Sequence, residues 1–408
     1  MADFWQSPDL VTIHNLHCST GPSAVERLLD RTRESPVGMV VPVHYRDVHG
    51  PAMMTIIREL GQSGISTNTV VVLNGANETQ AGEVAANLEH CDRQVRLLWA
   101  ESRHVGHILD HVERCHGLKV QGGKGVACWL GLGYLLQCTG AQAVAFQDAD
   151  VENFSAEMPA RLLLPLVFPE SGLAVSKAYY SRTGDRMYGR LTRQFLTPFV
   201  HAIRSLFPGS GFASLLAQLR YPLSGEIGMS RDFAQSCRIP SGWSLEINTL
   251  WDVQRMGMIS SLCQVDIADQ YNHKHHPVAS GDPCRQTLQA MASEIGTDLL
   301  ALLAREGNIL SPWHQRAFLD RFDRFAAIFH RAYACDAKCN GIPWIEEDEI
   351  GSIREFAKSA CEAVTQYRRN PAQRPTLPSW KSIAHSMPAA AGLLEGACHS
   401  PGPLTCAA

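Results

Sequence analysis

The feature that most constrains the fold of this chain is an alternation of apolar runs and amphipathic segments between residues 37 and 150. The Val- and Leu-rich runs cover 37–43, 68–75, 95–100 and 141–150, and the segments expected to be helical cover 50–64, 79–89, 104–116 and 123–140. Continuous apolar strands that alternate with helices form a parallel sheet covered on both faces. We therefore predict an α/β fold with a mostly parallel, Rossmann-like sheet.

The pattern changes outside this region. Further strands are expected near 172–180 and 260–269, with a helix-rich stretch between them, and 284–368 has the 3–4 residue apolar spacing of helices. The end of the chain mixes proline with Ala, Gly and Ser, which is typical of mobile segments. We predict four parts, listed here: a helical lead-in (1–37), an α/β domain (38–283), a helical region (284–368) and a flexible tail (369–408).

Composition excludes several classes of protein. The net charge is −4 over 408 residues without a Lys/Arg block, so no nucleic-acid partner is expected. There is no apolar run of about 18 residues, so no membrane span is expected, and the first residues lack the apolar core of a secretory signal. Thirteen scattered cysteines, an odd number, are typical of reduced thiols. We expect a cytoplasmic protein.

The segment AVAFQDADVEN (143–153) ends an apolar strand with Asp148 and Asp150. Two carboxylates this close repel one another, so positive charge is expected beside them. Ligands of such sheets bind at the carboxyl ends of the strands. One interpretation is a Mg²⁺ or Mn²⁺ ion that bridges the phosphates of a nucleotide. The other is an aspartyl-phosphate phosphatase with Asp148 as nucleophile, but the acidic run it needs downstream (346–349) lies in the predicted helical region.

Lys124 lies among glycines at the start of a predicted helix, in QGGKGVACW. The glycines allow the backbone to approach an anion, and a lysine beside free helix N–H groups favours phosphate. The segment is not a Walker loop. The nearby GLGYLL (131–136) lies inside a helix and lacks the third glycine of a dinucleotide fingerprint, which disfavours a dehydrogenase.

Two further groups of polar residues surround apolar segments. The loop after the last predicted strand contains His273, His275 and His276, which offer a third ligand to a cation held by the aspartates. Glu226 and Glu246 lie in apolar surroundings, either as structural carboxylates or as groups that orient a substrate hydroxyl.

Taken in order, these segments resemble nucleotide-sugar glycosyltransferases of the A-type fold, and more closely the glucosyl-3-phosphoglycerate synthases. The matching segments are VVPV (40–43), GKG (123–125), DAD (148–150), GRLT (189–192), PLSGE (222–226) and GWSLEI (242–247). The resemblance covers most of residues 37–280, and it implies a catalytic domain with a retaining, metal-dependent transfer of glucose to 3-phosphoglycerate.

The resemblance also implies roles on the donor side. Asp150 and His273 would ligate Mg²⁺ or Mn²⁺, and Asp148 would face the ribose and the cation. Lys124 would contact the pyrophosphate. The residues expected to border the nucleoside are Pro42, Asp47 and Asn74.

On the acceptor side, the resemblance implies that Gly189, Arg190 and Thr192 hold a phosphate, together with His275, which replaces the asparagine of the family. The backbone carbonyl of Leu223 would lie near the reacting hydroxyl, and Glu246 on the glycerate hydroxyl side. We favour front-face transfer, in which the leaving phosphate accepts the proton of the acceptor, over Glu246 as a nucleophile.

Departures from the family leave alternatives open. The first strand continues as PVHYRD (42–47) where the family has P-A-L-N-E-E. A sister enzyme with a mannosyl donor or a glycerate acceptor stays possible, as do UDP, GDP and ADP as the donor nucleotide. An inactive sugar-nucleotide-binding protein is disfavoured by the retention of Lys124, both aspartates and His273. The expected partners are a nucleotide sugar and a small phosphorylated acceptor, and we expect a homodimer.

Overall fold

A computed structural model describes residues 5–16, 21–65, 68–91, 95–120, 122–273, 283–372 and 374–399. Within these residues, nine strands form one sheet in the order β1-β8-β6-β7-β5-β2-β3-β4-β9. The strands are β1 Val11–Ile13, β2 Val37–His44, β3 Thr69–Asn74, β4 Arg96–Trp99, β5 Ala143–Phe146, β6 Val175–Tyr180, β7 Ile227–Ser230, β8 Leu262–Ala268 and β9 Cys398–His399.

Most neighbouring strands are parallel, as the sequence predicts. Strand β2 is parallel to both β3 and β5, and β3 is parallel to β4. Strand β7 is antiparallel to both of its neighbours, β5 and β6, and β9 is antiparallel to β4. Because β2, β3, β4 and β5 are parallel, their carboxyl ends meet at one edge of the sheet.

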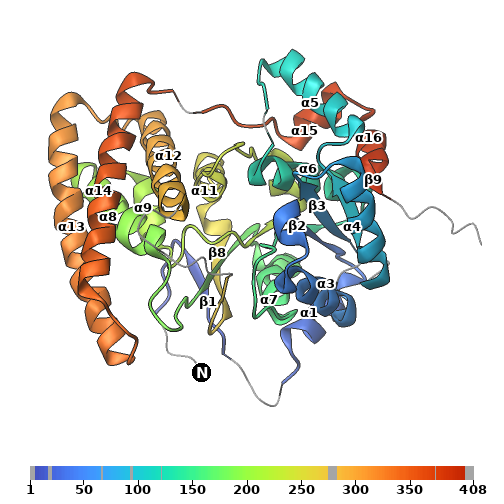
Figure 1. Ribbon diagram of the computed structural model, residues 1–408, viewed down its shortest axis with the longest axis horizontal. Coiled ribbons are helices and arrows are strands. Elements are labelled where there is room, and N and C mark those ends of the chain that lie inside the picture. The colour runs from blue at the N-terminus through green and yellow to red at the C-terminus, as the bar shows by residue number, and fades with distance from the viewer. Residues whose placement is uncertain are drawn as a thin grey trace, which may run out of the picture.

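Helices cover both faces of this sheet (Figure 1). Those of the first half are α1 Ala24–Thr32, α2 Tyr45–Val48, α3 Pro51–Ser63, α4 Glu78–Cys91, α5 Arg103–His116, α6 Lys124–Cys138 and α7 Glu157–Leu163. Alternate residues of each strand point to opposite faces. Accordingly, Val40 and Val72 belong to the core beneath α5 and α6, whereas Val41 and Val71 belong to the core beneath α3 and α4.

Helix α6 is buried on nearly all sides, and glycines allow its close packing. A Cβ atom at Gly131 would lie 2.4 Å from Val40 on the sheet, and one at Gly133 would lie 2.0 Å from Trp380 on the other side. Neither separation is possible without displacement of the neighbour. The glycines of GLGYLL therefore serve packing rather than nucleotide binding.

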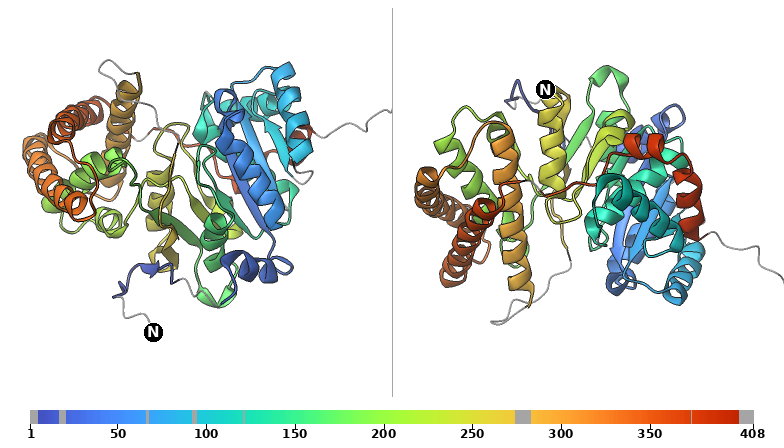
Figure 2. Two further views of the ribbon diagram at one scale, coloured as in Figure 1. Left: turned by 60° about the horizontal axis from the view of Figure 1, so that its bottom comes forward. Right: turned by 90° about the horizontal axis from the view of Figure 1, so that it is seen from above.

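A second group of helices lies at one end of the sheet (Figures 1 and 2). The helices of the second half of the chain, not all of which belong to this group, are α8 Thr197–Leu206, α9 Gly211–Gln218, α10 Arg231–Ser236, α11 Leu245–Arg255, α12 Pro283–Arg305, α13 Pro312–Cys339, α14 Glu346–Arg369, α15 Trp380–Ser386 and α16 Ala390–Ala397. A π-helical turn, Leu191–Leu196, precedes α8. Helices α12, α13 and α14, which together with α8 we call the helical group, all pack with the π-helical turn, and α13 also packs with α8. The predicted helical character of 284–368 is thus confirmed by the structure.

The flexible tail predicted for 369–408 is wrong over residues 374–399, which we call the C-terminal strap. After α14 the chain crosses the molecule to α15, α16 and β9, on the far side from the helical group (Figure 1). Trp380 is fully buried and stacks on Trp129 with ring centroids 4.5 Å apart. The indole of Trp380 donates to the Trp129 carbonyl (2.7 Å), and that of Trp129 donates to the Pro378 carbonyl (2.8 Å).

The helical lead-in predicted for 1–37 needs a smaller correction. Its amphipathic segment forms α1, which begins with a capping box between Ser23 and Glu26. Before it, β1 pairs in parallel with β8 at the opposite edge of the sheet from β9. Three residues are too short a strand to produce a readable alternation.

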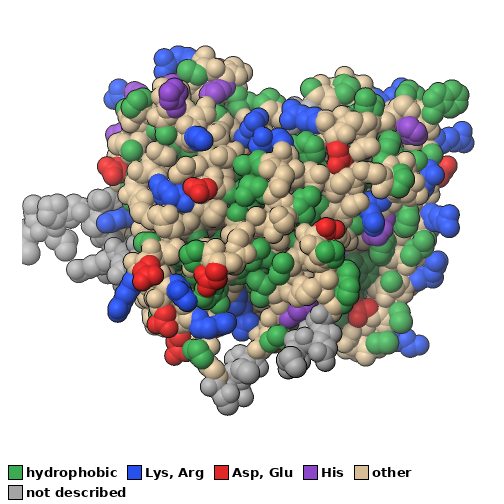
Figure 3. Space-filling view, turned by 180° about the vertical axis from the view of Figure 1, so that it is seen from behind, with side chains coloured by type: hydrophobic (Ala, Val, Ile, Leu, Met, Phe, Trp, Pro, Cys, Tyr) green, Lys and Arg blue, Asp and Glu red, His purple; other side chains and the backbone are tan. Residues whose placement is uncertain are grey.

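The surface mixes charges of both signs. Lys/Arg and Asp/Glu side chains are interspersed over the face seen in Figure 3. Among the described residues, no helix combines the length and the apolar character that crossing a bilayer requires.

Candidate active site

A cavity of ≈ 1130 Å³ opens between the sheet and the helical group. Its wall contains many residues selected from the sequence: Lys124, Asp148, Asp150, Gly189, Arg190, Thr192, Leu223, Glu246 and His273. It also contains Arg182, Arg186, Tyr221 and Trp243, together with apolar side chains of α12. Residues far apart in the chain therefore meet around one space that is large enough for a small-molecule ligand.

Two carboxylates and an imidazole form a cluster in this cavity. Asp148 and Asp150 follow β5 and His273 follows β8, and one potential ligand atom from each lies within 4.8 Å of the other two. An isolated antiparallel bridge between Val151 and His273 joins the two loops. Two carboxylate oxygens and one imidazole nitrogen are a donor set that fits Mg²⁺ or Mn²⁺.

The charge of the cluster is balanced by neighbouring groups. Nδ1 of His273 lies 3.0 Å from Oδ1 of Asp150. Burial alone would raise the pKa of Asp150, but the hydrogen bond and charge of His273 and the charge of Lys124 lower it below its ordinary value. Asp150 is therefore ionised at neutral pH, as a metal ligand must be.

Lys124 is the first residue of α6, and its Nζ lies 2.5 Å from Oδ1 of Asp148. Removal from bulk water lowers the pKa of Lys124, but the carboxylates of Asp148 and Glu246 outweigh this and raise it above its ordinary value. The preceding Gly123 provides no side-chain cap for the helix. Lys124 thus brings a positive charge to the cavity wall at the N-terminus of α6, where the helix dipole adds to it.

Glu246 lies in the first turn of α11 and is 8% exposed. Burial raises its pKa, while Lys124 and Lys177 act in the opposite direction. The other acid considered from the sequence, Glu226, is fully buried and accepts hydrogen bonds from Tyr180 (2.9 Å) and Tyr271 (2.5 Å). Glu226 is therefore a satisfied structural carboxylate, whereas Glu246 faces the cavity.

Lys177 on β6 is a residue that sequence reasoning missed. It is 1% exposed, and its Nζ donates to the carbonyl of Ser224 and to the Ser224 hydroxyl (2.8 Å). Burial lowers its pKa to about 8, although the negative charges of Glu246 and Glu226 act to raise it. It fixes the backbone beside Leu223. The available signal was a lone lysine within the apolar strand GLAVSKAYY.

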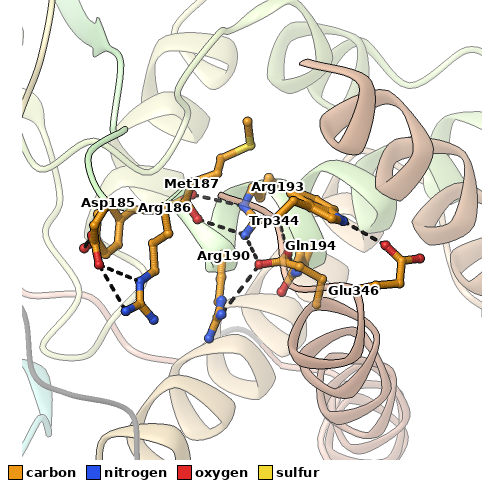
Figure 4. Close-up of polar contacts among 10 residues, drawn as sticks. Asp185, Arg186, Met187, Arg190, Arg193, Gln194, Trp344 and Glu346 are labelled. Atoms are coloured by element: carbon orange, nitrogen blue, oxygen red, sulfur yellow. Dashed lines mark hydrogen bonds and ion pairs between the residues drawn. The ribbon is translucent and has the colours of Figure 1, made fainter. Parts of the chain in front are cut away.

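The segment expected to bind the acceptor forms a tight turn. Gly189 has φ +70°, a conformation that favours glycine, and Arg190 precedes the π-helical turn Leu191–Leu196. Thr192 is 7% exposed, and the guanidinium of Arg190 lies 3.5 Å from the carboxylate of Glu349 on α14. Figure 4 shows this turn together with its partners from the helical group. Glu349 was also missed from the sequence, because its acidic run resembles an exposed helix start.

The C-terminal strap reaches the rim of the cavity as well. Arg374 forms a 2.5 Å ion pair with Glu294 of α12, and Glu294 accepts a 2.6 Å hydrogen bond from the backbone N–H of Trp243. Pro240 and Thr376 form an isolated antiparallel bridge. The strap therefore helps to hold the loop that leads to Glu246.

Four residues predicted for the site lie elsewhere or are not described. Pro42, Asp47 and Asn74 lie on β2, α2 and the end of β3, outside the wall of the described cavity. Asn74 is 8% exposed, and its Oδ1 has no hydrogen-bond partner within the part of the chain that the structure describes. His275 falls outside the described residues. The nucleoside and acceptor roles of these four residues stay predictions.

The fold and this site define a glycosyltransferase that uses a nucleotide sugar. No family model matches the chain, but a glucosyl-3-phosphoglycerate synthase of Persephonella marina is 30% identical over 389 residues, which cover 95% of this chain and 96% of that protein. One from Methanococcoides burtonii is 27% identical over 401 residues, covering 97% of each chain. The chain belongs to the glucosyl-3-phosphoglycerate synthase family.

Solved structures support the fold. The glucosyl-3-phosphoglycerate synthase of Mycobacterium tuberculosis, in complex with Mn²⁺, UDP-glucose and phosphoglyceric acid, has a TM-score of 0.52 at 20% identity and covers 74% of this chain and 89% of that one. The same enzyme with Mg²⁺ and UDP has a TM-score of 0.51. The predicted A-type glycosyltransferase fold is thereby confirmed.

Proposed function

We propose that this chain transfers the glucosyl group of a nucleoside-diphosphate glucose to 3-phosphoglycerate with retention of configuration. The products are glucosyl-3-phosphoglycerate and the free nucleoside diphosphate. One observation carries the proposal: a single cavity joins the Asp148–Asp150–His273 cluster to the Gly189–Thr192 turn. The first group suits a metal-bound diphosphate, and the second suits a phosphorylated acceptor. The named relatives act on these substrates, which supports the same assignment here.

On the donor side, Asp150 and His273 would hold the cation and Asp148 would face the ribose and the cation. When bound, a divalent cation supplies positive charge that stabilises the leaving diphosphate. Lys124 adds a second positive charge at the start of α6, where charge builds on the leaving phosphate. Pro42, Asp47 and Asn74 are proposed to border the nucleoside.

On the acceptor side, Arg190 offers a planar fork of N–H donors suited to a phosphate, with Thr192 two residues further on. The backbone carbonyl of Leu223 accepts from the reacting hydroxyl, and Lys177 fixes this backbone from behind through Ser224. Glu246 orients the glycerate end. His275 is proposed to assist with the phosphate.

Transfer is proposed to occur on the front face of the sugar. The bond from C1 to the leaving oxygen breaks, the acceptor oxygen attacks from the same side, and the leaving phosphate takes the proton of the acceptor. Ionised Glu246 is the candidate for the alternative, a covalent intermediate. Burial raises its pKa and disfavours the ionised form that a nucleophile needs, which supports an orienting role.

The experiment is a substrate panel. The protein with Mg²⁺ or Mn²⁺ is incubated with UDP-, ADP- and GDP-glucose and with GDP-mannose, each with 3-phosphoglycerate or glycerate. Released nucleoside diphosphate and the product mass are measured. The proposal expects a glucosyl donor with 3-phosphoglycerate to be the most efficient pair. A better rate with mannose or with glycerate would instead identify a sister enzyme, and the absence of any product would refute the proposal.

We further propose that the protein acts as a cytoplasmic homodimer and that residues 38–283, with β1 and β9 added to its sheet, form the catalytic unit beside the helical region 284–368. The nine cysteines whose side chains the structure describes are free thiols, which supports a reducing compartment. Light scattering during size-exclusion chromatography tests the dimer, and cell fractionation tests the compartment.

A further inference from the structure

Arg193 is saturated by contacts within the protein. Its Nη1 and Nη2 lie 2.5 and 2.9 Å from the two carboxylate oxygens of Glu349, and its Nε donates to the carbonyl of Tyr188 at 3.0 Å. The aromatic rings of Tyr333 and Trp344 lie 5.8 and 5.5 Å from its guanidinium carbon. With its side chain only 5% exposed, Arg193 serves the architecture of the turn rather than a ligand.

Arg190 shares the same carboxylate more loosely. Its Nη2 lies 3.5 Å from Oε1 of Glu349, and its side chain is 17% exposed and lines the cavity. Glu349 also accepts from the amide of Gln194 at 2.5 Å. One carboxylate thus contacts the guanidiniums of both arginines as well as the amide of Gln194. Figure 4 shows the two arginines converging on α14.

The two sides of this contact come from different parts of the chain. Both arginines and Gln194 belong to the turn that leads from β6 to α8, whereas Glu349 lies in the first turn of α14, in the helical region. Helix α14 packs closely along α12, whose Leu288, Met291 and Ile295 line the same cavity. The position of Glu349 is therefore set by the packing of the helical group.

We propose that Glu349 is a positioning residue of the acceptor site: it holds the π-helical turn through Arg193 and aims Arg190 at the acceptor phosphate. The helical region thus supplies an essential support for phosphate recognition by the α/β domain. This inference rests on the proposed function, because it takes Arg190 as the ligand of the acceptor phosphate. Without the carboxylate, two neighbouring arginines repel one another and Arg193 loses its partner, so the turn and Arg190 lose their fixed geometry.

The first test is Glu349→Gln, with Glu347→Gln as the matched control. Glu347 lies in the same helical turn and is exposed. We expect Glu349→Gln to raise the KM for 3-phosphoglycerate at least tenfold, with the KM for the nucleotide sugar changed less than twofold. Glycerate, which has no phosphate, should react at a rate that the substitution does not alter. Glu347→Gln should match the wild type.

A second variant guards against simple misfolding. In Arg193→Met/Glu349→Leu the buried ion pair is replaced by apolar side chains, an exchange that proteins commonly tolerate. If this variant melts near the wild-type temperature and still shows the raised KM for 3-phosphoglycerate, the positioning role is supported. An unchanged KM overturns it. A lowered KM also overturns it, because Glu349 would then compete with the phosphate for Arg190.

The proposed function and the proposed role of Glu349 can be tested separately. Calorimetric titration of the wild-type enzyme with 3-phosphoglycerate, beside the activity assay, decides between them. If the wild type neither binds nor glucosylates 3-phosphoglycerate, the proposed function fails and takes the inference with it. If it does both and the Glu349 variants behave like the wild type, only the role of Glu349 fails.

Discussion

Nδ1 of His273 lies 3.0 Å from Oδ1 of Asp150, although 123 positions separate the two residues in the chain. The contact joins the loop after β5 to the loop after β8, at one edge of the sheet. The imidazole–carboxylate contact orients both side chains beside Asp148, so that the three potential ligand atoms lie within 4.8 Å of one another.

Asp150→Ala or His273→Ala should lower kcat/KM at least about a hundredfold, because loss of a direct ligand exceeds the effect of losing a residue that merely supports a ligand. The measurement is product formation against Mg²⁺ and Mn²⁺ concentration, with circular dichroism to verify the fold. Asp269→Ala, an exposed aspartate just after β8, is the control. Full activity of either variant in chelated buffer would show that no cation is held here.

Lys124→Ala should reduce kcat/KM for the nucleotide sugar by roughly ten- to a hundredfold. A hydrogen bond to a charged group contributes about 1.5–3 kcal/mol, and this one acts on the phosphate as its charge builds. Steady-state kinetics with varied donor measure the effect, and the exposed Lys381→Ala provides the comparison. Unaltered kinetics would remove Lys124 from the donor site.

Arg190→Ala should raise the KM for 3-phosphoglycerate by about tenfold or more, since it removes a charged phosphate contact. The KM for the nucleotide sugar should barely change. Arg204→Ala, an exposed arginine on α8, is the matched control. A phosphorylated acceptor would be contradicted by equal rates with glycerate and 3-phosphoglycerate, together with an unchanged KM for 3-phosphoglycerate in the Arg190→Ala enzyme.

Lys177 should give the protein a measurable pH dependence of stability. In the folded protein burial lowers its pKa to about 8, whereas an unfolded lysine titrates near about 10.4. Between these values the unfolded chain binds more protons, so stability rises with pH and is lost as pH falls towards 8. Relative to Lys177→Met, the wild-type free energy of unfolding should increase by about 1.4 kcal/mol per pH unit in this window.

Urea unfolding at several pH values from 7.5 to 9.5 measures this difference. The exposed Lys381→Met variant is the reference, and its difference from the wild type should stay flat with pH. A flat difference for Lys177→Met as well would mean that the lysine keeps an ordinary pKa in the folded protein.

Trp380→Ala should destabilise the protein by about 3–5 kcal/mol, the usual cost of removing a fully buried large side chain. It also removes the stacking on Trp129 and the hydrogen bond that the Trp380 indole donates to the Trp129 carbonyl. Denaturant unfolding measures the loss, and limited proteolysis should cut within the C-terminal strap. Trp313→Ala, at a position 90% exposed, should change stability by less than about 0.5 kcal/mol.

The sheet and much of the cavity wall were predictable because their signals are local. Each central strand is a run of apolar residues, and polar residues such as Asp148 and His273 follow directly at strand ends. The resemblance to a family added the Gly189–Thr192 turn, which has no distinctive local chemistry of its own.

The missed features depend on distant contacts. Glu349 resembles any acidic residue in the first turn of a helix, and only packing brings it to Arg193, 156 positions away. The C-terminal strap has the proline, alanine and glycine content of a mobile tail, yet Trp380 and Leu394 are fully buried. The burial of a few large apolar side chains orders this segment despite its content of proline, alanine and glycine.

The pairing of β4 with β9 has a consequence for the order in which the protein can assemble. Strand β4 ends at Trp99, but its outer neighbour begins only at Cys398, after the whole helical region and the C-terminal strap. On the ribosome, the outer edge of β4 therefore stays unpaired through almost the entire synthesis of the chain. Unpaired strand edges form hydrogen bonds with strands of other chains and so promote aggregation. A nascent chain that stalls before residue 398 therefore exposes such an edge, and it becomes paired only when β9 has been made.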